Sequence, residues 1–589
     1  MTTTRYEEGD PSSPICLIGE APSFLEIKME RPFVGPAGQL LDKCLHAAKI
    51  MRRECYIINV FEDQVIRPKD AAGKIVNGYG DLLWSAGKGF SEIGKNACAP
   101  ALRRLRACKA NVIVPMGGPA LHLAIRQFEK PELSALNVAD QPQEYELQFE
   151  KKSISKWRGS IFYGIDGRKI VPTYHPSAAL KGQYEIRYYI VSDFRKAKVE
   201  SGFPEFIPDK RKLIIDPGFE ESINFMSRCL QAPIVDTDIE VLGGQMDCFS
   251  LSVSPDEAIS IPLIDAGFNH RWNETEERQI REGYARILGA PHIAKVNQNI
   301  AFDIATLLQL DKIVTRGPIH DPMVAFSVMN AFLDKGLGTI VSMLTREPYY
   351  KDDGTLEDSP TVDDFARRWE YNAKDSACAL ESWLKLEKDL TDEGYWDTYN
   401  LHMGEISALA YMMVQGLLIN EKELDITKAQ ARTELAETIV KLSAAMGRPV
   451  ITKAPKTAKE KREVAATNAI NVNSPAQLKD YFYAGKGIKP YTNPGGVPTT
   501  DDKALAQLVR RYGLPEAKLM QEYRSQSKLL GTYLEMGYDG DKRLRCSYNI
   551  RGTWTGRLSS SQTIFGTGGN FQNIPPEFRG FLVSNEVGE

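Results

Sequence analysis

The hydrophobic periodicity changes along the chain, and this change limits the fold more than any other feature. Short apolar runs, such as residues 15–18, alternate with helical patterns over residues 1–206 and again over residues 213–388. This alternation is typical of α/β layers. Residues 389–545 carry mainly helical patterns, and residues 546–589 are rich in Gly, Ser, Asn and Pro. Since 589 residues exceed what one core usually serves, we predict a multidomain α/β protein with four parts.

Composition excludes a few classes of protein. No apolar run approaches the roughly 20 residues that cross a bilayer, and the first 14 residues are too polar for a signal peptide. Nine cysteines occur without a CxxC pair, which predicts reduced thiols and a cytoplasmic location. The net charge of −4 does not indicate a nucleic-acid binder, so any contact with DNA must come from local basic patches.

Acidic residues recur at the ends of apolar elements in the second part. Asp238 and Glu240 stand two apart after an apolar run, and on a strand they project from one face. Adjacent acids repel unless a cation lies between them. Asp303 ends another apolar element, and Tyr371 and Asp375 lie one helical turn apart. A single D-x-E is more often a solvated strand end, so the prediction depends on the whole set.

The order D-x-E, N-x-x-x-D, Y-x-x-x-D resembles the DnaQ-type 3′–5′ exonucleases, which implies an RNase H-like domain over residues 213–388. The resemblance implies that two Mg²⁺ or Mn²⁺ ions bind here and that Tyr371 orients the attacking water. Carboxylates suit these ions because they prefer hard oxygen ligands. Asp321 is expected to lie behind the metal ligands without binding the metal itself, and Asp236 is the alternative first ligand. The implied metal ligands are Asp238, Glu240, Asp303 and Asp375.

The third and fourth parts carry polymerase-like patterns. Residues 389–545, which include a helical pattern over 401–417, resemble the thumb of family A DNA polymerases. Residues 553–560 and 570–575 together resemble the first conserved motif of that family, at the start of its palm. The resemblance implies that Arg557 contacts a phosphate and that Gln572 and Asn573 reach the minor groove.

The two palm aspartates and the fingers of that family have no counterpart within residues 1–589. Nucleotidyl transfer needs the metal site that these aspartates form. We therefore expect a second polypeptide to supply palm and fingers.

Four segments in the first part resemble family 4 uracil-DNA glycosylases, which implies an α/β sandwich over residues 1–206. They are residues 19–26, 31–35, 56–59 and 171–177. An enzyme of this kind flips a base out of the stack and stabilises a cationic sugar. The resemblance implies that Phe33 stacks on uracil and that Asn59 reads its edge. It also implies that Glu20 and Glu26 orient water or stabilise the cation, and that His175 stabilises the departing anion.

The cysteines depart from the family 4 pattern. The N-terminal cysteine pair is missing, Cys98 is the only plausible survivor, and residues 62–94 do not match the cysteine-containing loop. We therefore expect no iron–sulfur cluster. Uracil excision and a non-catalytic DNA-binding module both stay open for this part.

Three functions are compatible with these patterns. The preferred one is the N-terminal subunit of a split replicative polymerase, phage-encoded and acting in a bacterial cytoplasm. It would bind primer–template DNA and single-stranded 3′ ends. The alternatives are a stand-alone repair exonuclease and glycosylase, and a non-catalytic DNA-binding scaffold. A thumb and an Arg557 motif are useful only near a palm, which favours the first.

Overall fold

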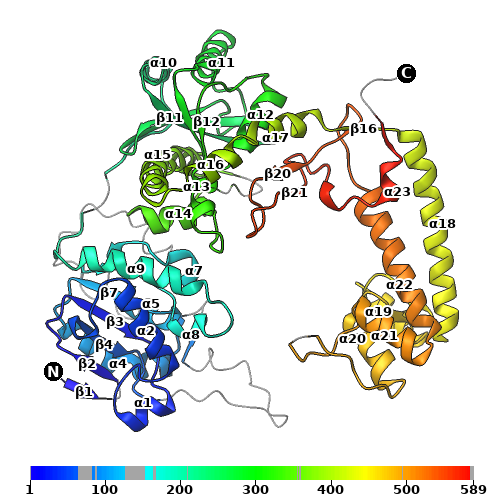
Figure 1. Cartoon of the computed structure of the whole chain (residues 1–589), viewed down its shortest axis with the longest axis horizontal. Coiled ribbons are helices and arrows are strands. Elements are labelled where there is room, and N and C mark those ends of the chain that lie inside the picture. The colour runs from blue at the N-terminus through cyan, green and yellow to red at the C-terminus, as the bar shows by residue number, and fades with distance from the viewer. Residues whose placement is uncertain are drawn as a thin grey trace. The chain divides into compact units, whose positions relative to one another are not determined.

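The protein forms two compact units in a computed structural model (Figure 1). One unit contains residues 1–406 and 554–556, and the other contains residues 407–553 and 557–589. The structure describes the following residues: 2–4, 6–63, 83–85, 89–125, 153–163, 167–207, 210–354, 356, 360–493 and 495–583.

A seven-stranded sheet organises the first part of the chain. Its central strands are parallel, and its outer strands pair antiparallel. In order across the sheet the strands are β1 (Thr2–Thr4), β2 (Glu7–Gly9), β4 (Cys55–Asn59), β3 (Ile15–Gly19), β7 (Val112–Pro115), β9 (Lys169–Ile170) and β8 (Phe162–Tyr163). The central strands β3, β4 and β7 are buried along their whole length, as expected for parallel strands covered on both faces.

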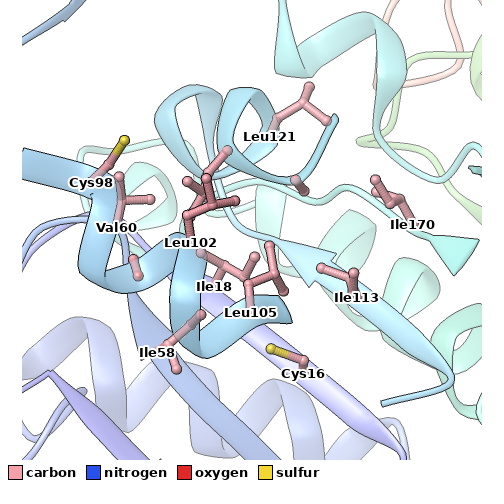
Figure 2. Packing of buried hydrophobic residues seen from close by; sticks show 14 of the residues in the cluster. Cys16, Ile18, Ile58, Val60, Cys98, Leu102, Leu105, Ile113, Leu121 and Ile170 are labelled. Atoms are coloured by element: carbon pink, nitrogen blue, oxygen red, sulfur yellow. The ribbon is translucent and has the colours of Figure 1, made fainter. Parts of the chain in front are cut away.

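Helices cover both faces of this sheet and create two separate cores. On one face, α4 (Glu92–Ala107) and α5 (Gly118–Ile125) pack over Ile18, Ile58 and Ile113 (Figure 2). On the other face, α2 (Pro36–Ala47) and α9 (Ile186–Glu200) pack over residues of the opposite parity, such as Leu17 and Ile57. Side chains of a strand alternate between faces, so one apolar run serves both cores. The remaining short helices are α1 (Phe24–Met29), α7 (Ile154–Trp157) and α8 (Pro176–Ala179).

A six-stranded sheet organises residues 212–320. In order across the sheet the strands are β10 (Lys212–Ile214), β13 (Glu257–Pro262), β12 (Gln245–Ser254), β11 (Ile234–Leu242), β14 (Ala294–Val296) and β15 (Ile319–His320). Strands β11, β12 and β13 pair antiparallel, whereas β14 and β15 join in parallel. The predicted D-x-E therefore lies on a central strand.

Two helix layers cover the second sheet. The helices α10 (Phe219–Cys229) and α11 (Glu274–Gly289) enclose the larger core. The 32-residue helix α15 (Val362–Glu393) packs against β11, β12 and β13. The smaller helices are α12 (Ile300–Leu310), α13 (Pro322–Met329), α14 (Leu337–Leu344) and α16 (Trp396–Met403). Helix α15 continues past the expected boundary at residue 388, and the compact unit continues to Ile406.

A buried charge pair in the first part of the chain contacts helix α14 of the second part. Arg158, in the first part, donates to Asp193 on α9 at 2.7 Å and to the Ser342 hydroxyl on α14 at 2.9 Å. Asp193 also accepts a hydrogen bond from Thr173 at 2.7 Å. Both members of the pair are almost fully buried, so each depends on the other for neutralisation.

Replacing Arg158 by alanine should lower the free energy of unfolding of this unit by about 3–5 kcal/mol, because Asp193 then stays buried and unpaired. Urea denaturation followed by circular dichroism measures the loss. Arg187→Ala, an exposed position on the same helix as Asp193, is the control and should change stability little. Equal stability of the two variants would contradict the assigned role of the pair.

The second unit is mainly helical. Its helices are α17 (Ile406–Gln415), α18 (Glu421–Met446), α19 (Ala458–Ala466), α20 (Pro475–Lys479), α21 (Asp502–Tyr512), α22 (Pro515–Lys528) and α23 (Pro576–Arg579). Helix α18 packs along α22 through an apolar cluster around Leu442, and a second cluster, around Leu534, joins α18 to the residues that follow α22. The short strands are β16 (Leu417–Ile419), β17 (Val450–Ile451), β18 (Ile470–Asn471), β19 (Arg543–Leu544), β20 (Ser547–Asn549), β21 (Ser559–Ser561) and β22 (Leu582–Val583).

Residues 401–417 are mostly helical, as the pattern predicts, but they do not form one continuous helix. Helix α16 ends at Met403, α17 ends at Gln415, and residues 417–419 form β16. Gly416 adopts a positive φ of 58°, which a residue with a side chain rarely tolerates, and the chain turns there into the strand. Among the described residues, none of the helices has the length and apolar character that a membrane span requires.

Candidate functional site

Three carboxylates meet where α15 crosses β11. Asp238 and Glu240 project from one face of the strand, as their spacing predicts, and Asp375 faces them from the helix. One oxygen atom of each carboxylate lies within 4.8 Å of the other two. Asn372, one turn before Asp375, donates to Asp238 Oδ2 at 2.9 Å and fixes its orientation. The sequence-predicted group of acids therefore includes a real cluster.

The cluster is electrostatically unfavourable without a cation. Burial, together with the charges of Asp303 and Glu240, raises the pKa of Asp238 well above its usual value. Burial also raises the pKa of Glu240 to about 7, against an opposing contribution from Arg368. Three hard oxygen donors at this separation suit a divalent ion such as Mg²⁺ or Mn²⁺. The residues present therefore fit the expected metal.

Asp303 and Asp236 lie near the cluster without joining its three closest carboxylates. Asp303 Oδ1 accepts from the Ile239 backbone N–H at 3.2 Å, between the two strand acids, and burial raises its pKa to about 8. Asp236 is fully buried at the inner end of the strand, and burial raises its pKa well above the usual value. The structure thus brings Asp238, rather than the alternative Asp236, together with Glu240 and Asp375.

Tyr371 lies beside the cluster, and the Lys351 ammonium contacts both. The Lys351 ammonium donates to both oxygens of Asp375, at 2.6 and 2.9 Å, and also to the Tyr371 hydroxyl. Lys351 Nζ lies 4.3 Å from the centre of the Tyr371 ring. Burial and the nearby carboxylates raise the pKa of Tyr371, so its hydroxyl keeps its proton and donates at neutral pH.

Arg368 is a second cation that the sequence analysis missed. Its guanidinium lies 3.1 Å from Glu240 and holds Asp247 through two hydrogen bonds of 2.8 and 3.0 Å. Arg368 lies three residues before Tyr371 on α15, and that helical spacing is the signal that could have placed it on the same face. Nothing in the sequence pattern indicates Lys351, which lies in a loop.

Asp321 supports the backbone rather than the carboxylate cluster. Its side chain caps α13 by accepting from Met323 N at 2.8 Å, and it also accepts from Asn299 N and Ile300 N at 3.1 and 3.2 Å. These bonds fix the turn that leads into α12, the helix that carries Asp303. The expected position of Asp321 directly behind the metal ligands stays a prediction.

A second group of predicted residues gathers at the carboxyl ends of the parallel strands in the first sheet. A Cβ atom on Gly19 would lie 2.4 Å from Asn59 Oδ1 and 2.5 Å from the Phe33 ring, so only glycine lets them approach β3. The rings of Phe33 and His175 lie 5.7 Å apart. Phe33 has a positive φ of 53°, an uncommon conformation that marks functional loops.

Burial favours the neutral form of the His175 ring and lowers its pKa to about 4. Ser177 approaches Nδ1 with its backbone N–H, which donates at 3.2 Å, and with its hydroxyl oxygen at 2.8 Å. With Nδ1 as the acceptor of these contacts, the proton of the neutral ring lies on Nε2. Glu26 accepts from Ser23 N in the capping box of α1, which gives its carboxylate a structural role. Glu20 follows β3 at the same end of the sheet.

Cys98 lies in the apolar core over the sheet, among the residues drawn in Figure 2. Burial raises the pKa of its thiol to about 11, which disfavours the thiolate that a metal cluster needs. Most of the segment 62–94, in which the expected cysteine loop was not found, lies outside the described residues.

The polymerase-like motif forms a hydrogen-bonded loop. Arg557 N donates to the Thr553 hydroxyl at 3.1 Å, and Thr553 N donates to Arg557 O at 3.2 Å, which closes a tight turn. Gln572 Nε2 donates to Leu558 O at 2.9 Å and so joins the two halves of the motif. Asn573 ends the short helical turn Phe571–Asn573 next to Gln572.

Two family models match the chain. Residues 6–195 match the uracil-DNA glycosylase superfamily, and residues 442–587 match DNA polymerase family A. The chain joins a glycosylase-superfamily domain to a family A polymerase domain. The Gly19, Asn59, Phe33 and His175 group lies in the glycosylase domain, and the Arg557 loop lies in the polymerase domain.

Known relatives match different portions of the chain. The type-4 uracil-DNA glycosylase of Thermotoga maritima is 28% identical over 198 residues, which cover 33% of this chain and 82% of that protein. DNA polymerase I of Pseudomonas aeruginosa is 28% identical over 58% of this chain, and the DNA polymerase of Bacillus phage SP01 is 22% identical over 70%. The matches span 36% and 51% of these two polymerases.

Proposed function

We propose that this chain acts on DNA as the proofreading part of a replicative polymerase and removes nucleotides from 3′ ends. The observation that carries the proposal is the carboxylate cluster of Asp238, Glu240 and Asp375. Bound divalent ions would supply an activated water and neutralise the leaving oxygen of a phosphodiester. Asp238, Glu240 and Asp375 would hold these ions, with Asp303 as the fourth ligand.

The chain's own residues would orient the reactants. The Tyr371 hydroxyl, protonated at neutral pH, donates a hydrogen bond toward the attacking water. Asn372 keeps Asp238 in place, and Arg368 limits the repulsion at Glu240. These contacts hold the oxygen donors in position before DNA binds, and such preorganisation is a main source of catalytic power.

A nuclease assay tests the proposal. Single-stranded DNA labelled at its 5′ end should shorten stepwise from the 3′ end with Mg²⁺ or Mn²⁺ and stay intact with EDTA. A 3′-phosphorothioate linkage should protect the strand. Purified protein that leaves the strand intact at saturating Mn²⁺ would contradict the exonuclease proposal.

We further propose that the glycosylase domain removes uracil from DNA. The neutral His175 ring, with its proton on Nε2, supplies a hydrogen-bond donor to the departing uracil anion. Phe33 provides a stacking surface close to it, and Asn59 offers an amide that reads a pyrimidine edge. The 28% identity to the Thermotoga maritima type-4 enzyme supports this assignment.

Replacing His175 by alanine should lower the rate of uracil release by about 100-fold or more, because one donor to a developing anion is lost. The wild-type rate should show no titration of His175 between about pH 5 and 8, since its pKa of about 4 keeps the ring neutral there. Alkali cleavage of a uracil-containing oligonucleotide measures both. His46→Ala, an exposed histidine on α2, is the control. DNA binding without uracil release would favour the binding-module alternative.

We also propose that residues 442–587 work together with a palm and fingers that lie outside residues 1–589. The match to DNA polymerase family A over residues 442–587 covers the helices α21 and α22 and the Arg557 loop. Strand β22 pairs with β16 on one side and is the edge strand of its sheet among the described residues. An edge of this kind accepts another strand.

A further inference from the structure

Residues 345–353 connect the glycosylase domain to the carboxylate cluster, and we call them the linking segment. On the glycosylase side, the Tyr349 backbone N–H donates to the Ser160 hydroxyl at 3.1 Å. Lys156 holds both oxygens of Asp352 at 2.9 and 3.0 Å. The Tyr349 ring packs against Trp157, with ring centres 5.9 Å apart. Three successive contacts thus fix the segment to the first domain.

The same segment enters the carboxylate cluster. Lys351 lies between Tyr349 and Asp352 and binds Asp375 and Tyr371. Tyr350 is buried, at 3% exposed, against the apolar side of α15. Adjacent Cα atoms are about 3.8 Å apart, so Lys351 cannot move far while its neighbours stay fixed. The position of its ammonium therefore depends on contacts with the other domain.

Further contacts at both ends support this path. At the first residue of the linking segment, the Lys196 ammonium of α9 binds the backbone carbonyl of Thr345. The same ammonium binds the backbone carbonyl of Gly159 in the glycosylase domain. Directly after the linking segment, Gly354 O accepts a hydrogen bond of 3.0 Å from Arg368, which also pairs with Glu240. A Cβ on Gly354 would lie 2.6 Å from the Tyr371 ring, so the chain passes directly over that side chain.

We propose that Lys351 is a positioning residue of the exonuclease site and that the glycosylase domain, through the linking segment, sets how tightly the carboxylates bind a divalent ion. The inference rests on the proposed exonuclease function. A positive charge bound to Asp375 opposes the approach of a second cation by Coulomb repulsion. Loss of the ammonium, or release of the segment that holds it, should therefore tighten metal binding.

Manganese binding to the full chain, measured by electron paramagnetic resonance of free Mn²⁺, tests this without DNA. Lys351→Met should lower the dissociation constant on the order of tenfold. Lys351→Arg keeps the charge and should stay close to wild type. Lys388→Met, which removes an exposed ammonium paired with Asp392 on the same helix as Asp375, is the control and should have no effect.

The interdomain step has its own test. The double variant Lys156→Met, Ser160→Ala removes two contacts to the linking segment while it leaves every carboxylate in place. The double variant should tighten Mn²⁺ binding about threefold or more, which is a smaller effect than that of Lys351→Met. Lys95→Met, which changes a partly exposed lysine that pairs with Glu92 on α4, is the matched control in the same domain. Thermal melting of each variant verifies that both domains stay folded.

The outcomes separate this inference from the proposed function. If wild type binds Mn²⁺ no better than Asp238→Ala, the metal site itself is absent and the exonuclease proposal fails. If wild type binds Mn²⁺ through the cluster but Lys351→Met leaves the affinity unchanged or weaker, only the role of Lys351 is overturned. If Lys351→Met tightens binding and the double variant does not, control by the glycosylase domain is overturned.

Discussion

Replacing Asp375 by asparagine is expected to slow nucleotide release from a 3′ end by about a thousandfold or more, because the carboxylates and their ions act as a unit. Asp375 lies within 4.8 Å of both strand acids, so loss of its charge weakens the binding of any ion that they share. Single-turnover digestion of labelled single-stranded DNA at saturating Mg²⁺ measures the rate of the chemical step rather than that of product release.

A matched variant on the same helix isolates the effect. Asp392→Asn removes an exposed carboxylate near the end of α15 that pairs with Lys388, and its rate should equal that of wild type. Asp375→Asn should fold normally, because the change is isosteric and relieves repulsion within the cluster. A rate within tenfold of wild type for Asp375→Asn would place the active carboxylates elsewhere.

Local spacing explains why this cluster could be predicted from the sequence. On a strand, residues two apart share a face, which fixes Asp238 beside Glu240 before the fold is known. On a helix, residues four apart share a face, which brings Tyr371 over Asp375. The structure places the first pair on β11 and the second on α15, which packs directly on that strand.

Contacts between distant segments could not be predicted in this way. Lys351 reaches Asp375 from a loop, and its position depends on Ser160 and Lys156, nearly two hundred residues earlier in the chain. No periodicity encodes such a contact, because it arises only when two separate sheets pack together. The break of the 401–417 pattern was missed for a related reason, since β16 forms by pairing with β19 and β22, which lie far along the chain.

The placement of the residues predicted for the glycosylase site follows from the sequence only in part. Gly19 and Asn59 end neighbouring parallel strands, so their approach follows from the sheet alone. The positive φ of Phe33 does not follow, because phenylalanine rarely adopts this conformation. The Glu26 side chain caps its own helix, and its role at the cationic sugar stays a prediction.

Primer extension is expected to be absent with residues 1–589 alone and to appear when a polypeptide that carries both palm aspartates is added. Within residues 1–589 we identify no candidate for these aspartates, and transfer of a nucleotide requires the metal site that they form. The partner should bind at β22 and around the Arg557 loop, and a stable interface of this kind buries on the order of 2,000 Å² or more. Affinity purification from the natural host, followed by extension of a labelled primer, provides the test.

Arg557→Ala should lower the extension rate of the mixed proteins about 100-fold, because a charged contact to a phosphate is lost at the reacting end of the duplex. Arg432 is an exposed arginine of α18 that pairs with Glu535, and Arg432→Ala should leave the extension rate unchanged. Wild type, Arg557→Ala and Arg432→Ala should have the same exonuclease activity, since the carboxylate cluster lies in the other compact unit. Primer extension by residues 1–589 without any added palm would contradict the proposal. Extension that is insensitive to Arg557→Ala would instead remove the loop from the polymerase site, because a residue that grips the primer–template phosphate must affect the rate at which it is extended.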